Sequence, residues 1–171
     1  MLSTVLAIDA GQTGMKVRVQ QGESHRDVLF GGIRTHEPLL PQLADVVRAA
    51  IARTGAHPGI VTAGISGLTD RDADAGALLR LLQWTGIHRA TLAHDSTTSF
   101  LGALGDARGA VVAAGTGVVT LAVGRDAVAR VDGWGYLMGD AGSGYWIGRR
   151  PTSRCRPTVI ACRSSHRSPS R

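Results

Sequence analysis

The spacing of the apolar residues changes sharply near Pro38, and this change limits the fold more than any other feature of the sequence. Residues 3–9 form an apolar run ended by Asp-Ala-Gly, and residues 15–20 alternate between apolar and polar side chains. Residues 25–31 form a third such segment, which glycines close. Beyond Pro38 the apolar residues recur every three or four positions, which is the period of a helix. The sequence therefore predicts three strands and then a helix that begins near Pro38 and ends at Gly55.

The rest of the chain continues as strands and helices in alternation. We expect the order βββαβαβα, followed by a second ββ unit that restarts the same plan, as in a duplicated protein. Such an order gives an α/β layer with helices on both faces of the sheet. We divide the chain into a first domain (1–108), the start of a second, incomplete domain (109–148) and a tail (149–171). The remaining predicted segments are strands 60–66, 90–94, 109–114, 118–123 and 127–131, and helices 73–84 and 96–104.

The basic character of the chain belongs to its tail. Residues 1–148 contain twelve Lys and Arg against thirteen Asp and Glu, whereas residues 149–171 contain seven Arg and no acid. The net charge of +6 therefore gives no reason to expect a nucleic-acid partner for the two domains. We interpret the tail as a disordered end or as residues translated beyond a frame disruption; the alternative is a basic arm for nucleic acid or anionic lipid. Its two cysteines, Cys155 and Cys162, are too few for a zinc site.

The sequence also bears on location. No segment reaches the roughly 18 consecutive apolar residues of a membrane span. The N-terminus lacks the basic and then apolar pattern of a secretory leader. We therefore expect no membrane partner and a cytoplasmic protein.

Two similar glycine turns each follow an apolar strand. The first is Asp-Ala-Gly-Gln-Thr-Gly at residues 9–14, and the second is Gly-Thr-Gly at residues 115–117. Glycine lets consecutive backbone N–H groups face an anion. Asp9 is suited to order the water shell of a metal ion, and Thr13 to donate to a phosphate. The alternative is an ordinary glycine turn capped by Asp9; a P-loop is excluded because no Gly-Lys-Ser/Thr follows.

Asp95 stands where a predicted strand ends and a helix begins. Here an aspartate can act as a general base that accepts a hydroxyl proton during phosphoryl transfer. The alternative is a plain N-cap for the helix at 96–104. We interpret the preceding His94 as a packing residue on the opposite face. The loop at 64–69 is expected to line the same edge, because open α/β sheets bind ligands at the carboxyl ends of their strands.

The segment 132–148 is unusually rich in glycine and aromatic residues. It contains six glycines, two tryptophans and two tyrosines in seventeen residues. Aromatic faces stack on the apolar faces of sugars, and carboxylates accept hydrogen bonds from hydroxyl groups. The segment therefore predicts a carbohydrate site; the alternative is a glycine-rich connection with aromatic anchors.

Taken together, these motifs resemble those of the BadF/BadG/BcrA/BcrD ATPase family. The residues that carry the resemblance are Asp9–Gly14, Asp95, Gly115–Gly117 and above all the segment Gly-Trp-Gly-Tyr-Leu-Met-Gly-Asp-Ala-Gly-Ser-Gly-Tyr-Trp-Ile-Gly at 133–148. The family includes the N-acetylglucosamine kinases and belongs to the actin/hexokinase/Hsp70 superfamily. The resemblance implies an actin-like ATPase (ribonuclease H-like) fold and ATP-dependent phosphorylation of a sugar hydroxyl.

The resemblance also implies a role for each motif. ATP and Mg²⁺ would be the cofactors, with Asp9 acting on the metal through water and Asp95 as the base for the sugar hydroxyl. The partners would be the sugar and ATP, and a homodimer is left open. The nucleotide phosphates would lie against Gly11, Thr13, Gly115, Thr116 and Gly117, and the sugar against Gly133, Trp134, Gly135 and Asp140.

The sequence departs from the family pattern at several positions. Val118 and Val119 follow the second glycine turn where family sugar kinases usually have polar residues, and Ala141 replaces a glutamate. Family members are also longer, and their adenosine-binding loop has no counterpart here. We therefore expect a kinase with impaired activity, and as alternatives a non-catalytic sugar- or phosphate-binding remnant or a BadF-type ATPase. The last depends on cysteines for an iron–sulfur cluster, and residues 1–148 contain none.

Overall fold

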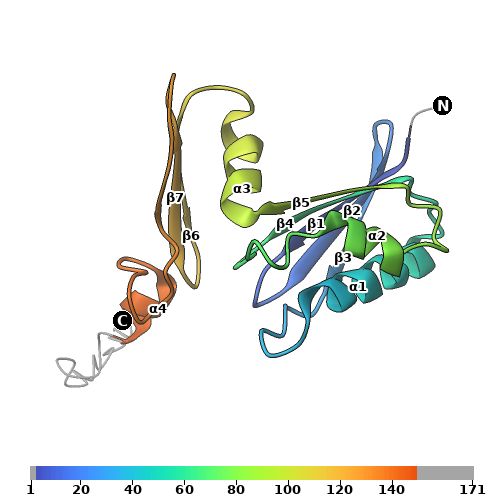
Figure 1. Cartoon of the computed structure of the whole chain (residues 1–171), viewed down its shortest axis with the longest axis horizontal. Helices are drawn as coiled ribbons and strands as arrows, with labels where there is room; N and C mark the ends of the chain where they lie inside the picture. The colour runs from blue at the N-terminus through green and yellow to red at the C-terminus, as the bar shows by residue number, and fades with distance from the viewer. Residues whose placement is uncertain (1–2, 150–171) are drawn as a thin grey trace, which may run out of the picture.

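The computed structural model describes residues 3–149, so the predicted basic tail lies, apart from Arg149, outside the described residues. The first part of the chain forms a five-stranded sheet in the order β3-β2-β1-β4-β5 (Figure 1). The first three strands are antiparallel neighbours, and β4 and β5 continue the sheet parallel to β1. The strands are β1 (Val5–Ala10), β2 (Met15–Gln21), β3 (Ser24–Phe30), β4 (Ile60–Ile65) and β5 (Arg89–His94).

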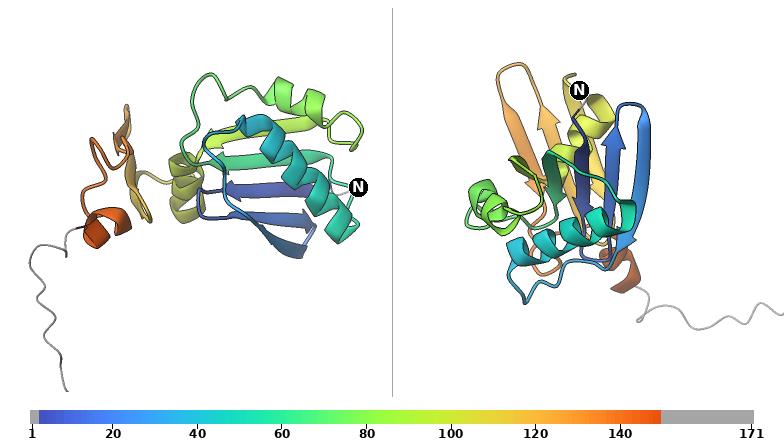
Figure 2. Two further views of the ribbon diagram at one scale, coloured as in Figure 1. Left: turned by 90° about the horizontal axis from the view of Figure 1, so that it is seen from below. Right: turned by 90° about the vertical axis from the view of Figure 1, so that its right-hand side faces the viewer.

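Three helices accompany this sheet: α1 (Leu39–Thr54), α2 (Ala75–Leu81) and α3 (Asp95–Leu104). Helices α1 and α2 lie side by side over one face (Figure 2), and α3 contacts β4 and β5. The apolar stripe of α1 and alternate residues of the strands form one buried core. Its fully buried large side chains include Leu6, Val17, Leu43, Val47, Val61, Ile65, Leu78 and Leu82.

The ends of helices α1 and α2 can be compared with the ends predicted from the sequence. Gly55 is left-handed (φ 67°), and its N–H bonds to the carbonyl of Ile51, so the predicted end of α1 is confirmed. Pro38 is extended (φ −56°, ψ 132°) and is the N-cap, so the helix begins at Leu39, next to the predicted start. Helix α2 is shorter than predicted because the Asp74 side chain caps it, accepting from Ala77 N, and the chain turns after Leu81.

A second, three-stranded sheet follows, in the order β6-β7-β8 with antiparallel neighbours. It repeats the antiparallel plan of the first three strands. Figure 1 shows α3 between the two sheets, and α3 contacts both β6 and β7. The domain boundaries predicted after residues 108 and 148 stay predictions. The elements are β6 (Gly109–Ala114), β7 (Val118–Val123), β8 (Val128–Asp132) and a short helix α4 (Gly144–Arg149).

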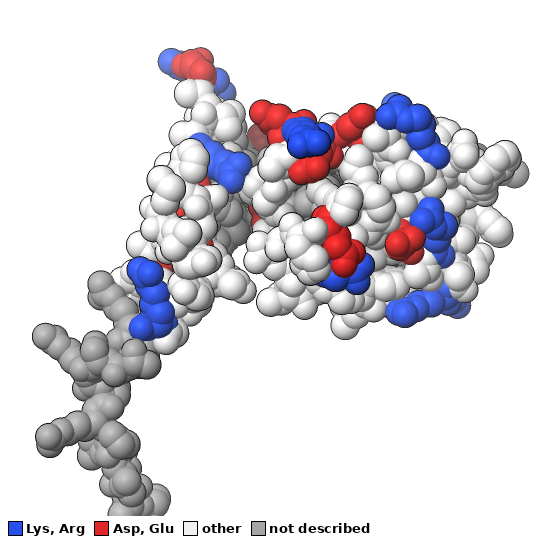
Figure 3. All heavy atoms as spheres, turned by 60° about the horizontal axis from the view of Figure 1, so that its bottom comes forward, with Lys and Arg blue, Asp and Glu red and all other residues white. Residues whose placement is uncertain are grey.

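The surface carries charges of both signs. Figure 3 shows acidic and basic side chains interspersed on the face that it displays. Some of them form exposed pairs, such as Arg18 with Asp27 and Arg48 with Asp45, each at 2.7 Å. No helix within residues 3–149 is long and apolar enough to cross a membrane.

Candidate functional site

Three strand ends meet at one edge of the first sheet. Ala10, Ile65 and His94 are partners across β1, β4 and β5, which run in the same direction. The loops that leave these strands therefore begin at the same level, and Ser66 N donates to the carbonyl of Ala10 (2.9 Å). The predicted approach of the 64–69 loop to this edge is confirmed for its first residues. Figure 1 shows this edge turned toward α3 and the second sheet.

The first glycine turn joins β1 to β2 and is held by backbone contacts. Gly11 N donates to the carbonyl of Gly14 (3.1 Å), and the carbonyl of Gly11 accepts from Ile33 N (2.9 Å). Gly32 lies so close to the carbonyl of Gln12 that any Cβ there would clash. The turn is thus fixed by its own backbone and by the segment that follows β3.

The two predicted ligand residues of this turn are free to bind. The Asp9 and Thr13 side chains are exposed, and neither has a hydrogen-bond or ion-pair partner within residues 3–149. Asp9 also lines a hollow of about 530 Å³ on the sheet face away from α1 and α2, together with Lys16, Thr62 and Leu101. Such an exposed carboxylate is a suitable outer ligand for a hydrated Mg²⁺ ion.

Asp95 is the first residue of α3, and its neighbour His94 is the N-cap. The plain N-cap interpretation of Asp95 is therefore wrong, because the His94 Nδ1 atom is the one that meets Ser96 N (3.3 Å). The packing role expected for His94 is also wrong, since Nδ1 lies 2.6 Å from Asp95 Oδ1. Burial lowers the pKa of His94; the Asp95 carboxylate raises it, and Arg130 of β8 lowers it.

Helix α3 packs closely against β4. Gly64 touches the Thr98 side chain so closely that a Cβ on Gly64 would overlap it. Thr98 Oγ1 in turn donates to the carbonyl of Asp95 (3.0 Å). The close approach at Gly64 thus fixes the first turn of α3, and with it the position of the Asp95 backbone.

The second glycine turn is bound by the segment that follows β8. The carbonyls of Gly115 and Thr116 accept from Gly144 N (2.8 Å) and Tyr145 N (3.2 Å). Val118 N donates to Asp140 Oδ1 (2.9 Å). The Thr116 side chain is exposed and has no hydrogen-bond partner in the described part of the chain. Residues 140–145 thus fix the backbone of this turn, and the Thr116 hydroxyl is free to bind a ligand.

The predicted sugar residues have different surroundings. Asp140 is buried, and its carboxylate accepts from Val118 N directly after the second glycine turn, whereas 74% of Trp134 is exposed. Asp132 Oδ1 accepts from both Gly133 N and Asp140 N (2.9 Å each) and closes the loop that contains Gly133, Trp134 and Gly135. Asp132 lies in the predicted sugar segment but was not among the predicted site residues. The Asp-Gly pair at 132–133 is the signal that could have identified it as a turn residue.

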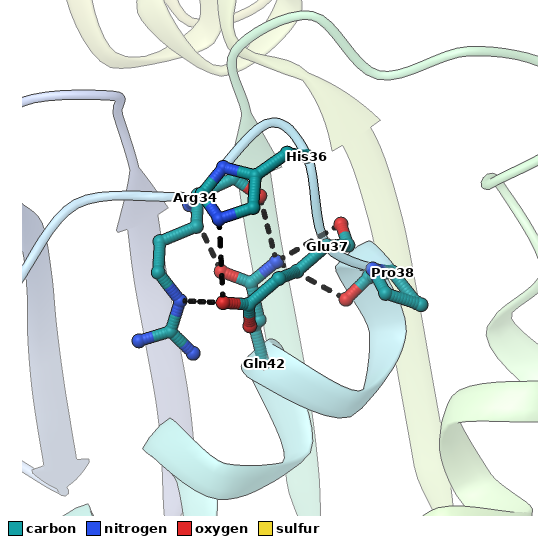
Figure 4. Close-up of polar contacts among 5 residues, drawn as sticks. All are labelled: Arg34, His36, Glu37, Pro38 and Gln42. Carbon is teal, nitrogen blue, oxygen red and sulfur yellow. Dashed lines mark hydrogen bonds and ion pairs between the residues drawn. The ribbon is translucent and has the colours of Figure 1, made fainter.

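The segment 33–38 is held by one buried side chain. Gln42 of α1 donates through Nε2 to the carbonyls of Arg34, Glu37 and Pro38 (3.0–3.2 Å), and its Oε1 accepts from Arg34 N (2.9 Å) (Figure 4). Glu37 Oε1 lies 2.7 Å from Arg34 Nε and 3.6 Å from His36 Nε2. Gln42 was also missed, because a single polar residue beside an apolar helix stripe carries no signal of its partners.

The candidate site therefore consists of two groups. Asp9, Thr13 and Asp95 lie at the shared edge of the first sheet, and the second glycine turn lies with Asp140 and the aromatic segment in the second unit. Within residues 3–149 no hydrogen bond joins Asp9, Thr13 or Asp95 to residues 115–117. The described residues also hold no group of three or more His, Cys, Asp or Glu side chains that could bind a metal ion.

The sequence matches no protein-family model and no curated protein. Solved structures do match. A candidate N-acetylglucosamine kinase from Chromobacterium violaceum is 29% identical, with a TM-score of 0.64 over 87% of this chain and 55% of its own. Another from Porphyromonas gingivalis is 24% identical, with a TM-score of 0.71 over 85% of this chain and 53% of its own.

A third match is a ROK family glucokinase from Streptomyces griseus, solved with glucose and AMPPNP. It is 17% identical, with a TM-score of 0.50 over 76% of this chain and 47% of its own. The chain thus spans about half the length of these structures. The likeness confirms the predicted fold, the actin-like ATPase fold of sugar kinases.

Proposed function

We propose that this polypeptide is, or is part of, an ATP-dependent sugar kinase of the N-acetylglucosamine or glucosamine type in the BadF/BadG/BcrA/BcrD family. The observation that carries the proposal is the alignment of Ala10, Ile65 and His94 across three parallel strands. This alignment puts the first glycine turn and Asp95 at one edge, where open α/β sheets bind their ligands. The names of the two N-acetylglucosamine kinase structures, and the glucose and AMPPNP bound to the glucokinase, support the substrate class.

The residues fit the cofactors that this function needs. The free hydroxyls of Thr13 and Thr116 would bind the phosphates of ATP, and Gly11, Gly115 and Gly117 would let the backbone of the two turns approach them. The N–H groups of Gly11 and Gly115 already donate to the carbonyls of Gly14 and Gly117, so these glycines would contribute close approach rather than free donors. A cage of several carboxylates is not expected for Mg²⁺ in a kinase, because this ion keeps several waters and binds substrate phosphates. The single exposed carboxylate of Asp9 therefore suits contact through water. Bound Mg²⁺–ATP would supply the γ-phosphoryl group and neutralise its charge.

The chain's own contribution to the reaction is position and proton transfer. Asp95 would accept the proton of the sugar hydroxyl as that oxygen forms its bond to phosphorus. Trp134 would stack on an apolar face of the sugar, and Gly133 and Gly135 would let the backbone approach it. Asp140 would have a positioning role: its hydrogen bond to Val118 N joins the predicted sugar segment to the strand that follows the second glycine turn.

The test is ADP release by the purified 171-residue chain with ATP, Mg²⁺ and N-acetylglucosamine, glucosamine or glucose in turn. We expect sugar-dependent turnover, and we expect Asp95→Asn to lower kcat by about a hundredfold or more, because general-base catalysis contributes that much. Asp106→Asn, an exposed aspartate just after α3, makes the same charge change away from the site and should leave kcat unchanged.

Two outcomes would contradict the proposal. Equal activity of the Asp95→Asn variant and the parent chain would remove Asp95 as the base. Sugar binding by calorimetry without any turnover of a folded chain would favour the non-catalytic binding module instead.

A further inference from the structure

The side chains of His94 and Asp95 are in close polar contact at the start of α3. The His94 Nδ1 and Asp95 Oδ1 atoms are 2.6 Å apart, and the two side chains are only 17% and 29% exposed. Asp95 Oδ1 itself is buried, and no other donor in the described residues reaches it. A buried carboxylate oxygen without a donor is costly, so the proton on Nδ1 decides whether this contact is favourable.

Three contacts meet at the same ring nitrogen. The Ser96 hydroxyl, whose Oγ lies 3.0 Å from Nδ1, can donate or accept and so fits either tautomer. Ser96 N points at Nδ1 from 3.3 Å and would need Nδ1 to be an acceptor. Asp95 Oδ1, at 2.6 Å, would need Nδ1 to be the donor if the carboxyl group is ionised. A hydrogen bond to an ionised group is shorter and about twice as strong as a neutral one, so the contact with Asp95 should prevail.

Burial, more than the neighbouring charges, favours the neutral form of the imidazole. His94 is partly buried at the end of β5, and this burial is the largest cause of its lowered pKa. The cation that faces it from the second sheet is Arg130 of β8, which acts in the same direction; Asp95 on its own helix opposes both. A neutral imidazole has one N–H, and its position on Nδ1 or Nε2 is set by the partners of the ring.

We propose that His94 is a positioning residue for Asp95: its neutral imidazole carries the proton on Nδ1, donates it to Asp95 Oδ1, and leaves Oδ2 for the sugar hydroxyl. The exposed part of the Asp95 side chain lies away from the buried Oδ1, as this arrangement needs. The role in catalysis rests on the proposed kinase function, whereas the hydrogen bond itself does not.

The first test reads the hydrogen bond without turnover. Long-range ¹H–¹⁵N spectra of the full chain, labelled at histidine, distinguish an Nδ1–H from an Nε2–H imidazole. We expect His94 to be the Nδ1–H form in the parent chain and to change to Nε2–H in Asp95→Ala, where Nδ1 becomes free to accept from Ser96 N. The exposed His57 should be unchanged in both. An Nε2–H form of His94 in the parent chain would overturn the proposal.

The second test separates positioning from folding. His94→Ala should lower kcat by about ten- to a hundredfold with less change in the KM for the sugar, since a small misplacement of a catalytic group has a cost of this order. His94→Asn keeps an amide donor and a favourable N-cap, so it should recover most of the loss. His57→Asn is the matched control. Equal kcat values for His94→Ala and the parent chain would refute the positioning role. An inactive parent chain would instead count against the kinase function, while the tautomer measurement would still decide the hydrogen bond.

Discussion

At the scale of single residues, the Gln42 side chain binds four backbone groups of one short segment. It is 6% exposed and bonds to three carbonyls and one N–H of the segment 34–38. Gln42→Leu would remove all four hydrogen bonds in a partly buried place, so we expect the free energy of unfolding to fall by about 1–3 kcal/mol. Urea unfolding measures this. Gln83→Leu, at an exposed position, is the control, and an equal midpoint for the two variants would contradict the role of Gln42.

The same scale shows what the sequence can and cannot reveal about the site. Asp9 and Asp95 could be predicted because each stands at the end of an apolar strand, where the chain order alone puts them at the sheet edge. Gln42, Asp132 and His94 could not, because their roles depend on which atoms the fold brings to them. His94 is the clearest case: strand alternation points it away from Asp95, but the turn into α3 returns its ring to the carboxylate.

At the scale of elements, helix ends offer a test of local backbone strain. Gly55 has a φ of 67°, which costs a residue with a Cβ about 1 kcal/mol or more. Gly55→Ala should therefore lower the free energy of unfolding by about that amount. Gly102 lies within α3, and nothing is within 4 Å of its missing Cβ. Gly102→Ala should raise the free energy by about 0.5–1 kcal/mol, through helix propensity. Thermal unfolding of the pair measures both, and shifts of the same sign would be incompatible with this account.

Most elements of the fold follow from apolar spacing, and the exceptions have a local cause. Within residues 3–149, all eight strands and helices α1 to α3 lie within a few residues of their predicted bounds. Helix α2 is the main departure. Leu82 N bonds to the carbonyls of both Leu78 and Leu79, which tightens the last turn, and the chain then leads through Gly86 to β5. An apolar residue every three or four positions suits a tight turn as well as a helix, so spacing alone does not place this end.

At the scale of the whole molecule, α3 links the two sheets. Phe100 of α3 and Val119 and Leu121 of β7 are buried where they meet. Arg130 is the register partner of Leu121 and therefore shares that face, in agreement with its effect on the pKa of His94. The second sheet thus buries the face that meets α3, and α3 connects it to the shared edge of the first sheet. This dependence on tertiary contact explains why Arg130 carried no signal in the sequence.

None of the described residues packs against the opposite face of the second sheet. Val112, Thr120 and Val131 lie in register across its three strands, and the two valines are 63% and 61% exposed. Exposed apolar sheet faces and open edge strands promote association. We expect the chain to self-associate. Val112→Thr with Val131→Thr should weaken this association by about thirtyfold or more, because burial of each valine contributes on the order of 1 kcal/mol or more.

Sedimentation or light scattering over a concentration series measures this association. Val128→Thr is the matched control, because Val128 is 68% exposed but is the register partner of Val123, on the face that bears Leu121. It should leave the association unchanged. A parent chain that stays monomeric at all concentrations would refute the prediction. An equal effect of Val128→Thr would mean that general surface hydrophobicity, rather than the uncovered sheet face, drives the contact.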